Sequence, residues 1–228
     1  MSTQNQDQKH SIAGNSNQCE AKLESKNPLS RAFDIVAIAA SAGGIEALSR
    51  IFSKLPPDFP VAIVVVQHIP AHRASLIPKI LNRHTALVVK EAEEGEQLVP
   101  GTVYIAAPNF HLRVELDKTI GFSQSEKIHF LRPAAEILFS TVAQVYKERA
   151  IAVVLTGGNG DGAAGVKILN KAGSKIIAQD EATSAVFGMP AAAIETGCVD
   201  WILPLDRIST AIKNLVATGN IGESVYEQ

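Results

Sequence analysis

Three polar side chains in this sequence stand where a parallel α/β sheet would bring them together. Ser41 directly follows the apolar run 35–40, and His68 lies just past the apolar run 61–66. Asp161 ends a glycine-rich loop further along the chain. Segments just past the carboxyl ends of parallel strands line the ligand crevice of such a sheet. A nucleophile, a base and a carboxylate at three such places predict a hydrolase with a Ser-His-Asp triad.

Ser41 precedes Ala42-Gly43-Gly44, and a helical pattern begins at once. A strand, turn and helix in this order expose the hydroxyl and leave backbone N–H groups free at the helix start. The N–H of Ala42 is therefore the natural oxyanion donor. A serine that only caps the helix is an open alternative. A dinucleotide site is excluded, because two of the three fingerprint glycines and the acid after the second strand are missing.

His68 lies 27 residues after Ser41 (68 − 41), one strand–helix–strand unit further on. If the two strands are neighbours, about 4.8 Å apart, the imidazole can take the serine proton near neutral pH. A carboxylate at Asp161 could orient that imidazole and stabilise its cation. The alternatives are a strand-end histidine bonded to backbone and an aspartate that caps a helix.

The loop 156–162 carries four glycines in seven residues, which allows unusual backbone angles and close approach. It lacks the terminal Gly-Lys-Ser/Thr of a Walker loop, so a nucleotide phosphate site is excluded. The N–H of Gly158 is a second candidate oxyanion donor.

Five further residues are candidates for the crevice wall: Gly43, Gly157, Phe187, Met189 and Arg132. Core packing is the alternative for Phe187 and Met189. Arg132 could attract an acidic substrate, with a surface ion pair as the alternative.

The remaining histidines show no metal-ligand spacing, so neither a metal nor a cofactor is expected. They are interpreted as surface or loop residues: His10, His72, His84, His111 and His129.

The bulk composition favours one sizeable globular domain, since 46% of the 228 residues are apolar. A net charge of −2 gives no basic field for nucleic acid, and no apolar run approaches the ~20 residues of a membrane span. The N-terminus has no secretory signal pattern. With two cysteines, one of them (Cys19) in a polar segment, a cytoplasmic location is expected.

Alternating strand and helix patterns predict an α/β fold, a doubly wound and mostly parallel sheet between two helical layers. Strands are expected at 35–40, 61–66, 87–90, 103–106, 150–155, 175–178 and 201–203. Helices are expected at 44–55, 75–83, 133–147, 162–172, 190–196 and 205–216. An antiparallel hairpin is expected from 111–116 and 119–123.

Three segments are predicted along the chain. Residues 1–32 are rich in Gln, Asn, Ser and Lys and are expected to be a disordered polar tail. Residues 33–218 form the catalytic domain, and residues 219–228 form a flexible C-terminal tail.

Taken together, these segments resemble the catalytic domain of the chemotaxis protein-glutamate methylesterases, the CheB type. The resemblance implies a three-layer α/β/α fold and hydrolysis of γ-glutamyl methyl esters on chemoreceptor cytoplasmic helices. Methanol is released, and deamidation of receptor glutamines is a related activity. The family's serine, histidine and aspartate fall on Ser41, His68 and Asp161. The matching strings are 38–44, 66–70, 104–108, 155–163 and 187–190.

The sequence departs from the family pattern at several places. Ala42 replaces the usual threonine, and Gly158 and Asn159 replace the usual Met-Gly of the aspartate loop. Residues 71–75 are closer to methylesterase domains fused to methyltransferases. Only a polar tail precedes the domain, so a stand-alone esterase without an attached receiver domain is expected. A non-catalytic binding module and an esterase for another methyl ester are the alternatives.

Overall fold

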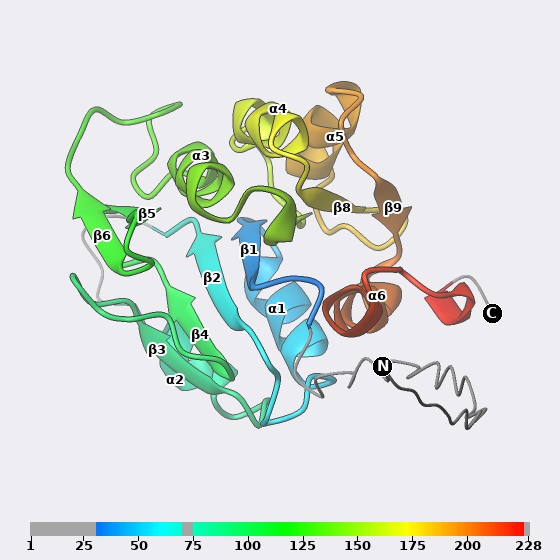
Figure 1. The fold of residues 1–228 in the computed structure, drawn as a ribbon. Coiled ribbons are helices and arrows are strands. Elements are labelled where there is room, and N and C mark those ends of the chain that lie inside the picture. Colours follow the sequence, from blue (N-terminus) through cyan, green and yellow to red (C-terminus); the bar gives the residue numbers. More distant parts are fainter. Residues whose placement is uncertain (1–30, 70–74, 226–228) are drawn as a thin grey trace, which may run out of the picture. The chain divides into compact units, whose positions relative to one another are not determined.

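A seven-stranded parallel sheet lies at the centre of the structure (Figure 1). The computed structural model describes residues 31–69 and 75–225. The strands lie in the spatial order β3-β4-β2-β1-β7-β8-β9. Their bounds are β1 Ile35–Ala40, β2 Ala62–Gln67, β3 Val88–Glu91, β4 Thr102–Ile105, β7 Ala150–Val154, β8 Lys175–Gln179 and β9 Trp201–Leu203.

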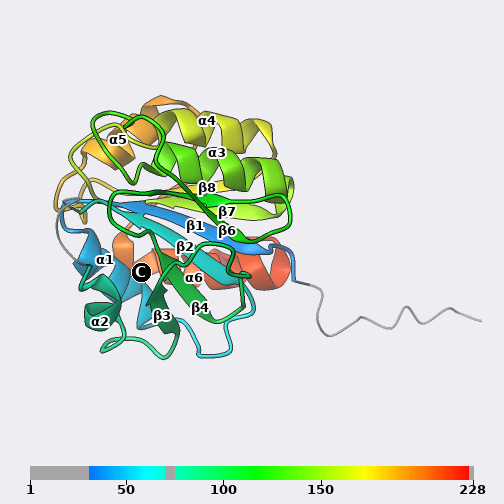
Figure 2. The same ribbon diagram turned by 90° about the vertical axis from the view of Figure 1, so that its left-hand side faces the viewer.

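Helices cover both faces of this sheet (Figure 2). One face carries α1 Gly44–Phe52, α2 Ile77–Leu81 and α6 Leu205–Thr218. The other carries α3 Ala135–Tyr146, α4 Ala163–Lys171 and α5 Gly188–Glu195. A separate antiparallel hairpin, β5 His111–Val114 with β6 Ile120–Ser123, precedes α3. The predicted three-layer fold with a mostly parallel sheet and a hairpin is confirmed.

The central strands are apolar throughout because helices bury both of their faces. All six residues of β1 and all six of β2 are buried. Their side chains alternate between two core clusters, one on each side of the sheet. A strand with two covered faces reads as a continuous apolar run rather than an alternating one.

The chain changes direction beside β1, and this position fixes where a ligand can bind. From β1 the chain passes to α1 on one face and on to β2, whereas from β7, on the other side of β1, it passes to α4 on the opposite face. The two connections therefore diverge at the carboxyl ends of β1 and β7. Such a topological switch point is where open α/β sheets bind ligands.

Four predicted helices, those expected at 44–55, 75–83, 133–147 and 162–172, are shorter than the sequence pattern indicates, and the first and third show why. The helix expected at 44–55 ends at Phe52, because Lys54 and Leu55 donate their N–H groups to carbonyls three residues back and tighten the last turn. The helix expected from residue 133 begins at Ala135, where a carboxylate from another segment caps it.

The C-terminal segment differs from its prediction. Residues 219–225 pack against the domain instead of extending from it: η2 Glu223–Val225 follows α6, and Val225 is buried in the core. Asn214 donates a hydrogen bond to the Ile221 carbonyl and holds the chain in place. The predicted N-terminal tail lies outside the described residues up to residue 30.

Candidate active site

Ser41 and His68 lie side by side at the carboxyl ends of adjacent strands. Ala40 pairs with Gln67 in the β1–β2 register, so the next residue of each strand follows in step. The His68 N–H donates to the Ala40 carbonyl at 3.0 Å, and the Ser41 N–H donates to the Thr156 carbonyl at 2.9 Å. These backbone bonds hold the serine between the histidine strand and the glycine-rich loop.

The peptide that joins Ser41 to Ala42 is held in one orientation. Its carbonyl oxygen accepts the Gln67 Nε2–H at 2.8 Å and the Gly44 N–H at 2.9 Å. In a trans peptide the N–H points opposite to the carbonyl, so the Ala42 N–H points away from both donors. It has no hydrogen-bond partner among the described residues. A fixed, unpartnered donor therefore adjoins the serine hydroxyl.

The turn after Ser41 requires glycine at Gly43. Its φ of 78° lies in the left-handed region, and an added Cβ would lie 2.6 Å from the Ala185 Cβ. Thr156 supports the same turn, because its hydroxyl lies 2.8 Å from the Ala42 carbonyl and accepts the Val186 N–H at 2.9 Å.

His68 and Asp161 form a buried pair. The His68 Nε2 lies 2.7 Å from the Asp161 Oδ2, and the two side chains are 6% and 0% exposed. With the carboxylate ionised, Nε2 carries the proton and donates it, so Nδ1 of the neutral ring holds the lone pair. That Nδ1 is buried and has no partner among the described residues. The ring thus presents an unused acceptor on the side away from Asp161.

Asp161 also caps a helix, but not the helix that follows it in sequence. Its Oδ2 accepts the Ala135 N–H at 2.6 Å and its Oδ1 accepts the Glu136 N–H at 3.2 Å, at the start of α3. The preceding residue of the chain there, Ala134, has no side-chain acceptor. The Asp161 carboxylate thus caps a helix and also contacts His68, so the two interpretations do not exclude each other.

The glycine loop packs tightly against Ser41. An added Cβ at Gly157 would lie 2.9 Å from the Ser41 Cβ and would also collide with the Met189 side chain. The Gly157 carbonyl accepts the Met189 N–H at 2.8 Å, which orients the peptide and turns the Gly158 N–H the other way. This N–H has no partner among the described residues either.

The two wall candidates Met189 and Phe187 differ in how deeply they are buried. Met189 is 1% exposed and lies in the core behind Gly157, whereas Phe187 is half-buried just before α5. Between them, Gly188 lets its chain approach the Gly158 backbone, since an added Cβ would lie 3.0 Å from the Gly158 carbonyl carbon.

The prediction that His111 is a surface or loop residue is wrong. His111 lies in β5 with no exposed surface. Its Nδ1 accepts the Ala134 N–H at 3.2 Å, so Nε2 carries the proton and donates it to the Glu126 carbonyl at 3.1 Å. Burial lowers the pKa of this imidazole, in agreement with a neutral ring. His10 and His72 lie outside the described residues.

Arg132 organises the loop before α3 and forms no ion pair with any residue that the structure describes, although an ion pair was the alternative given for it. Its guanidinium donates to the Asn109 Oδ1 at 2.8 Å and 3.2 Å and to the carbonyls of Gln124 and Ser125 at 2.8 Å and 2.9 Å. These donors are engaged within the loop, so attraction of an acidic substrate has no support here.

Sequence reasoning missed two buried glutamines that hold the site together. Gln67 carries the serine peptide, and Gln179 accepts the Thr156 N–H at 2.9 Å while donating to the Thr183 carbonyl at 2.7 Å. Each stands at the end of an apolar strand, where a buried amide must find partners. That position is the signal that could have found them.

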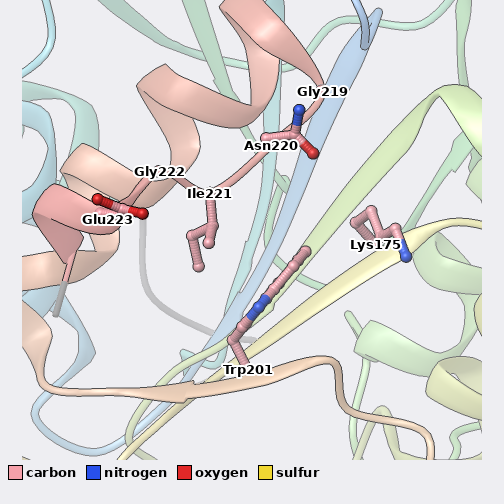
Figure 3. Close-up of a pocket in the computed structure, with 7 residues that line it drawn as sticks. All are labelled: Lys175, Trp201, Gly219, Asn220, Ile221, Gly222 and Glu223. Atoms are coloured by element: carbon pink, nitrogen blue, oxygen red, sulfur yellow. The ribbon is translucent and has the colours of Figure 1, made fainter.

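Two pockets lie at different ends of the molecule. One of about 200 Å³ adjoins the serine turn, with Gly43, Glu46 and Thr156 in its lining. Another of about 400 Å³ lies where β8 and β9 begin, lined by Lys175, Trp201 and residues 219–223 (Figure 3). Within the described ranges, no group of three or more His, Cys, Asp or Glu side chains could hold a metal ion, and no helix is long and apolar enough to cross a membrane.

Several known proteins are similar to this chain in sequence and in fold. A relative from Leptospira interrogans is 42% identical over 177 residues, which cover 78% of this chain and 92% of that protein. A protein-glutamate methylesterase/protein-glutamine glutaminase from Pyrococcus horikoshii is 43% identical over 197 residues. This alignment covers 83% of the present chain and 54% of the Pyrococcus protein, so the chain spans about half the length of that relative.

Among solved structures, the Thermotoga maritima CheB methylesterase catalytic domain superposes with a TM-score of 0.79 at 40% identity. The match covers 81% of this chain and 99% of the Thermotoga chain. The family described as CheB methylesterase matches residues 36–212. The resemblance drawn from the sequence motifs and the predicted class of enzyme, a carboxylic-ester hydrolase, are confirmed. The chain belongs to the CheB methylesterase family.

Proposed function

We propose that this protein hydrolyses γ-glutamyl methyl esters on chemoreceptors, with Ser41 as nucleophile, His68 as general base and Asp161 as its partner. The observation that carries the proposal is the unpartnered His68 Nδ1, buried beside Ser41 while Nε2 is held by Asp161. A buried acceptor without a hydrogen bond is costly to keep unless a reaction uses it.

The first half-reaction follows from these positions. Rotation about the Ser41 side chain brings its hydroxyl to His68 Nδ1, which removes the proton as Oγ attacks the ester carbonyl. The ring becomes an imidazolium, and the Asp161 carboxylate stabilises the new charge. Catalytic contacts of this kind often tighten only once a substrate is bound.

The N–H groups of Ala42 and Gly158 are the proposed oxyanion donors. Both belong to peptides whose carbonyls are held by other hydrogen bonds, so neither donor must reorganise during the reaction. One such donor typically contributes about 3 kcal/mol to lowering the barrier. The positive end of α1, which starts at Gly44, adds to the same field.

The His68 imidazolium then gives its proton to the departing methoxide, so methanol leaves and the acyl-enzyme remains. In the second half-reaction a water molecule attacks this acyl-enzyme, with His68 again as the base. The imidazolium returns the proton to Ser41 Oγ, and the receptor leaves with a free γ-carboxylate on its glutamate side chain. The same chemistry on a glutamine side chain releases ammonia, in keeping with the glutaminase part of the relatives' names.

The receptor's cytoplasmic helices are the proposed partner, and the cytoplasm is the proposed location. Both rest on the family and on what the names of the relatives say they act on. A non-catalytic binding module is not favoured, because the relatives are named as methylesterases and a binding site has no need of a buried imidazole acceptor without a partner beside a serine. A different methyl ester as substrate would leave the catalytic residues the same.

Methanol release from a methylated receptor fragment tests the proposal. Ser41→Ala should lose at least about 10³-fold in kcat, as triad variants do, without a change in thermal unfolding. Ser49→Ala, on the outer part of α1, is the matched control and should keep full activity. A Ser41→Ala protein that released methanol at the wild-type rate would refute the assignment.

A further inference from the structure

The turn Ile128–Leu131 carries the most exposed large apolar side chain of the described residues. Phe130 is 94% exposed, while the two ends of the turn are half-buried. Single apolar residues on a surface are ordinary, but large aromatic rings are seldom so fully in water.

The backbone of this turn is unfavourable for the residues it contains. His129 and Phe130 have φ values of 49° and 66°, two consecutive left-handed residues without a glycine. The turn is closed by the Leu131 N–H to the Ile128 carbonyl at 2.8 Å and by the reverse bond at 3.2 Å. Turns with this pair of angles strongly prefer Asn-Gly. Strained non-glycine residues gather at functional positions, where they present a side chain in a set direction.

Hydrogen bonds hold the turn on both sides, and those of His111 lead to the candidate active site. Arg132 binds the carbonyls of Gln124 and Ser125, and His111 binds the Glu126 carbonyl. The same His111 accepts the N–H of Ala134, and the next N–H along the chain binds Asp161. The turn is thus connected by a short series of hydrogen bonds to the His68 partner.

The turn also lies on the correct side of the molecule. The segment that joins β6 to α3 is at the upper left of Figure 1, on the side toward which β1 and β2 point. In Figure 2 the same segment is at the upper left, on the side toward which the strands run, and Figure 1 shows it on the opposite side of the molecule from α5. A protein substrate seated over Ser41 would meet this segment at the edge of the crevice.

We propose that Phe130 is a docking residue for the protein substrate, an amphipathic helix that presents its apolar face beside the esterified glutamate. The inference rests on the proposed function and adds a contact outside the catalytic residues. A single rigid aromatic ring fits the gap between side chains one turn apart on a helix. Because the turn is preorganised, little conformational entropy is lost when the ring is covered.

Phe130→Ala tests this contact in a comparison of two substrates. With a methylated receptor cytoplasmic fragment, the variant should raise KM about tenfold at unchanged kcat, the loss expected when part of an aromatic contact is removed. With N-acetylglutamate γ-methyl ester, which is too small to reach the turn, its kcat/KM should equal that of the wild type.

Leu116→Ala is the matched control. Leu116 is 84% exposed and also lies in a hairpin turn, between β5 and β6. This variant should leave KM for the fragment unchanged. An equal rise in KM for Leu116→Ala and Phe130→Ala would show that any exposed apolar side chain contributes to binding of the fragment, and this would overturn the inference.

A second variant separates the contact from the turn. His129→Asn combined with Phe130→Gly gives this turn the Asn-Gly pair that its backbone angles favour, so the thermal midpoint of unfolding should rise by a few degrees. KM for the fragment should still rise about tenfold. Unchanged KM in both Phe130 variants would overturn the docking role while Ser41→Ala still lacked activity, so this failure differs from failure of the proposed function.

Discussion

The two ends of the central sheet differ in how their polar groups are satisfied. At the amino end, Asp34 receives the Arg149 guanidinium at 2.7 Å and 2.9 Å and Arg31 at 3.0 Å. Lys175 pairs with Asp200 at 3.0 Å where β8 begins. At the carboxyl end, the His68 Nδ1 and the N–H groups beside Ser41 have no partner among the described residues.

This difference shows how one fold divides stability from chemistry. Paired charges at the amino end tie the first strand to the segment before β7. At the carboxyl end the same kind of hydrogen bond holds the peptides and the carboxylate, but leaves outward atoms free for a substrate. Buried polar groups are usually satisfied, so a cluster of unsatisfied ones marks a site of function.

Neutralising Asp161 at the carboxyl end of the sheet should give the largest loss of activity. Asp161→Asn keeps the shape and one acceptor oxygen, but its NH2 group replaces the other acceptor, so one of the two capping bonds to α3 is lost. The neutral amide also cannot stabilise an imidazolium, so we expect kcat for methanol release to fall about 10⁴-fold, with a loss of about 1–3 kcal/mol in unfolding free energy. A stable variant with wild-type kcat would contradict the assigned role of the carboxylate.

A single methyl group added at Gly157 should give the second largest loss of activity. Gly157→Ala places a Cβ against the side chains of Ser41 and Met189, so the serine must move, and a shift near 1 Å can cost about 10²-fold in rate. Gly160→Ala is the control in the same loop, since its Cβ would meet only the Ala192 Cβ at 3.6 Å. Equal activity of the two variants would show that close packing at Gly157 is not needed.

Variants of His111 test whether the segment that binds Asp161 can be weakened without a change to Asp161 itself. His111→Phe leaves the buried Ala134 N–H without a partner, which costs about 1–3 kcal/mol, and also removes the partner of the Glu126 carbonyl. His111→Gln can restore part of these bonds. We expect urea unfolding and kcat to rank wild type, Gln and Phe in that order; a Phe variant as active as wild type would exclude a positioning role.

The pH dependence of His111 has a definite sign. Burial lowers its folded pKa, while Arg132 lowers and Asp161 raises it. The unfolded chain therefore binds the proton more strongly, and stability is complete above the unfolded pKa near 6.5. It should fall as the pH drops through the lower folded value. Thermal unfolding between pH 7 and pH 5 should show this fall, and the fall should be smaller in His111→Gln.

The smallest effect is expected at the amino end. Hydrogen bonding from Arg149 lowers the pKa of Asp34 to about 2, so its contribution is present above the unfolded pKa of about 4 and is lost as pH falls toward 2. Because the Arg149 side chain is 44% exposed, Asp34→Asn should cost only about 1–2 kcal/mol at pH 7. Guanidinium unfolding measures this cost, and methanol release should be unchanged. A loss of activity would remove the division between the two ends.

The sequence was enough to predict the strands and the residues at their carboxyl ends. Apolar runs covered on both faces are unambiguous, and Ser41 and His68 follow such runs directly. The chain also brings Asp161 to the same place, as expected. What sequence patterns could not predict are contacts between distant segments: the capping of α3 by Asp161 and the burial of His111. Each depends on a side chain that meets backbone more than twenty residues away in sequence.

In the proposed mechanism, the shared oxygen of Asp161 links catalysis to the integrity of α3. One Oδ2 accepts from both His68 Nε2 and the Ala135 amide, so any opening of the first helical turn frees the carboxylate to swing away from the ring. Slow amide hydrogen exchange at Ala135 would then report the fraction of molecules with a competent site. A ligand that binds only the intact crevice should slow that exchange in proportion to its occupancy.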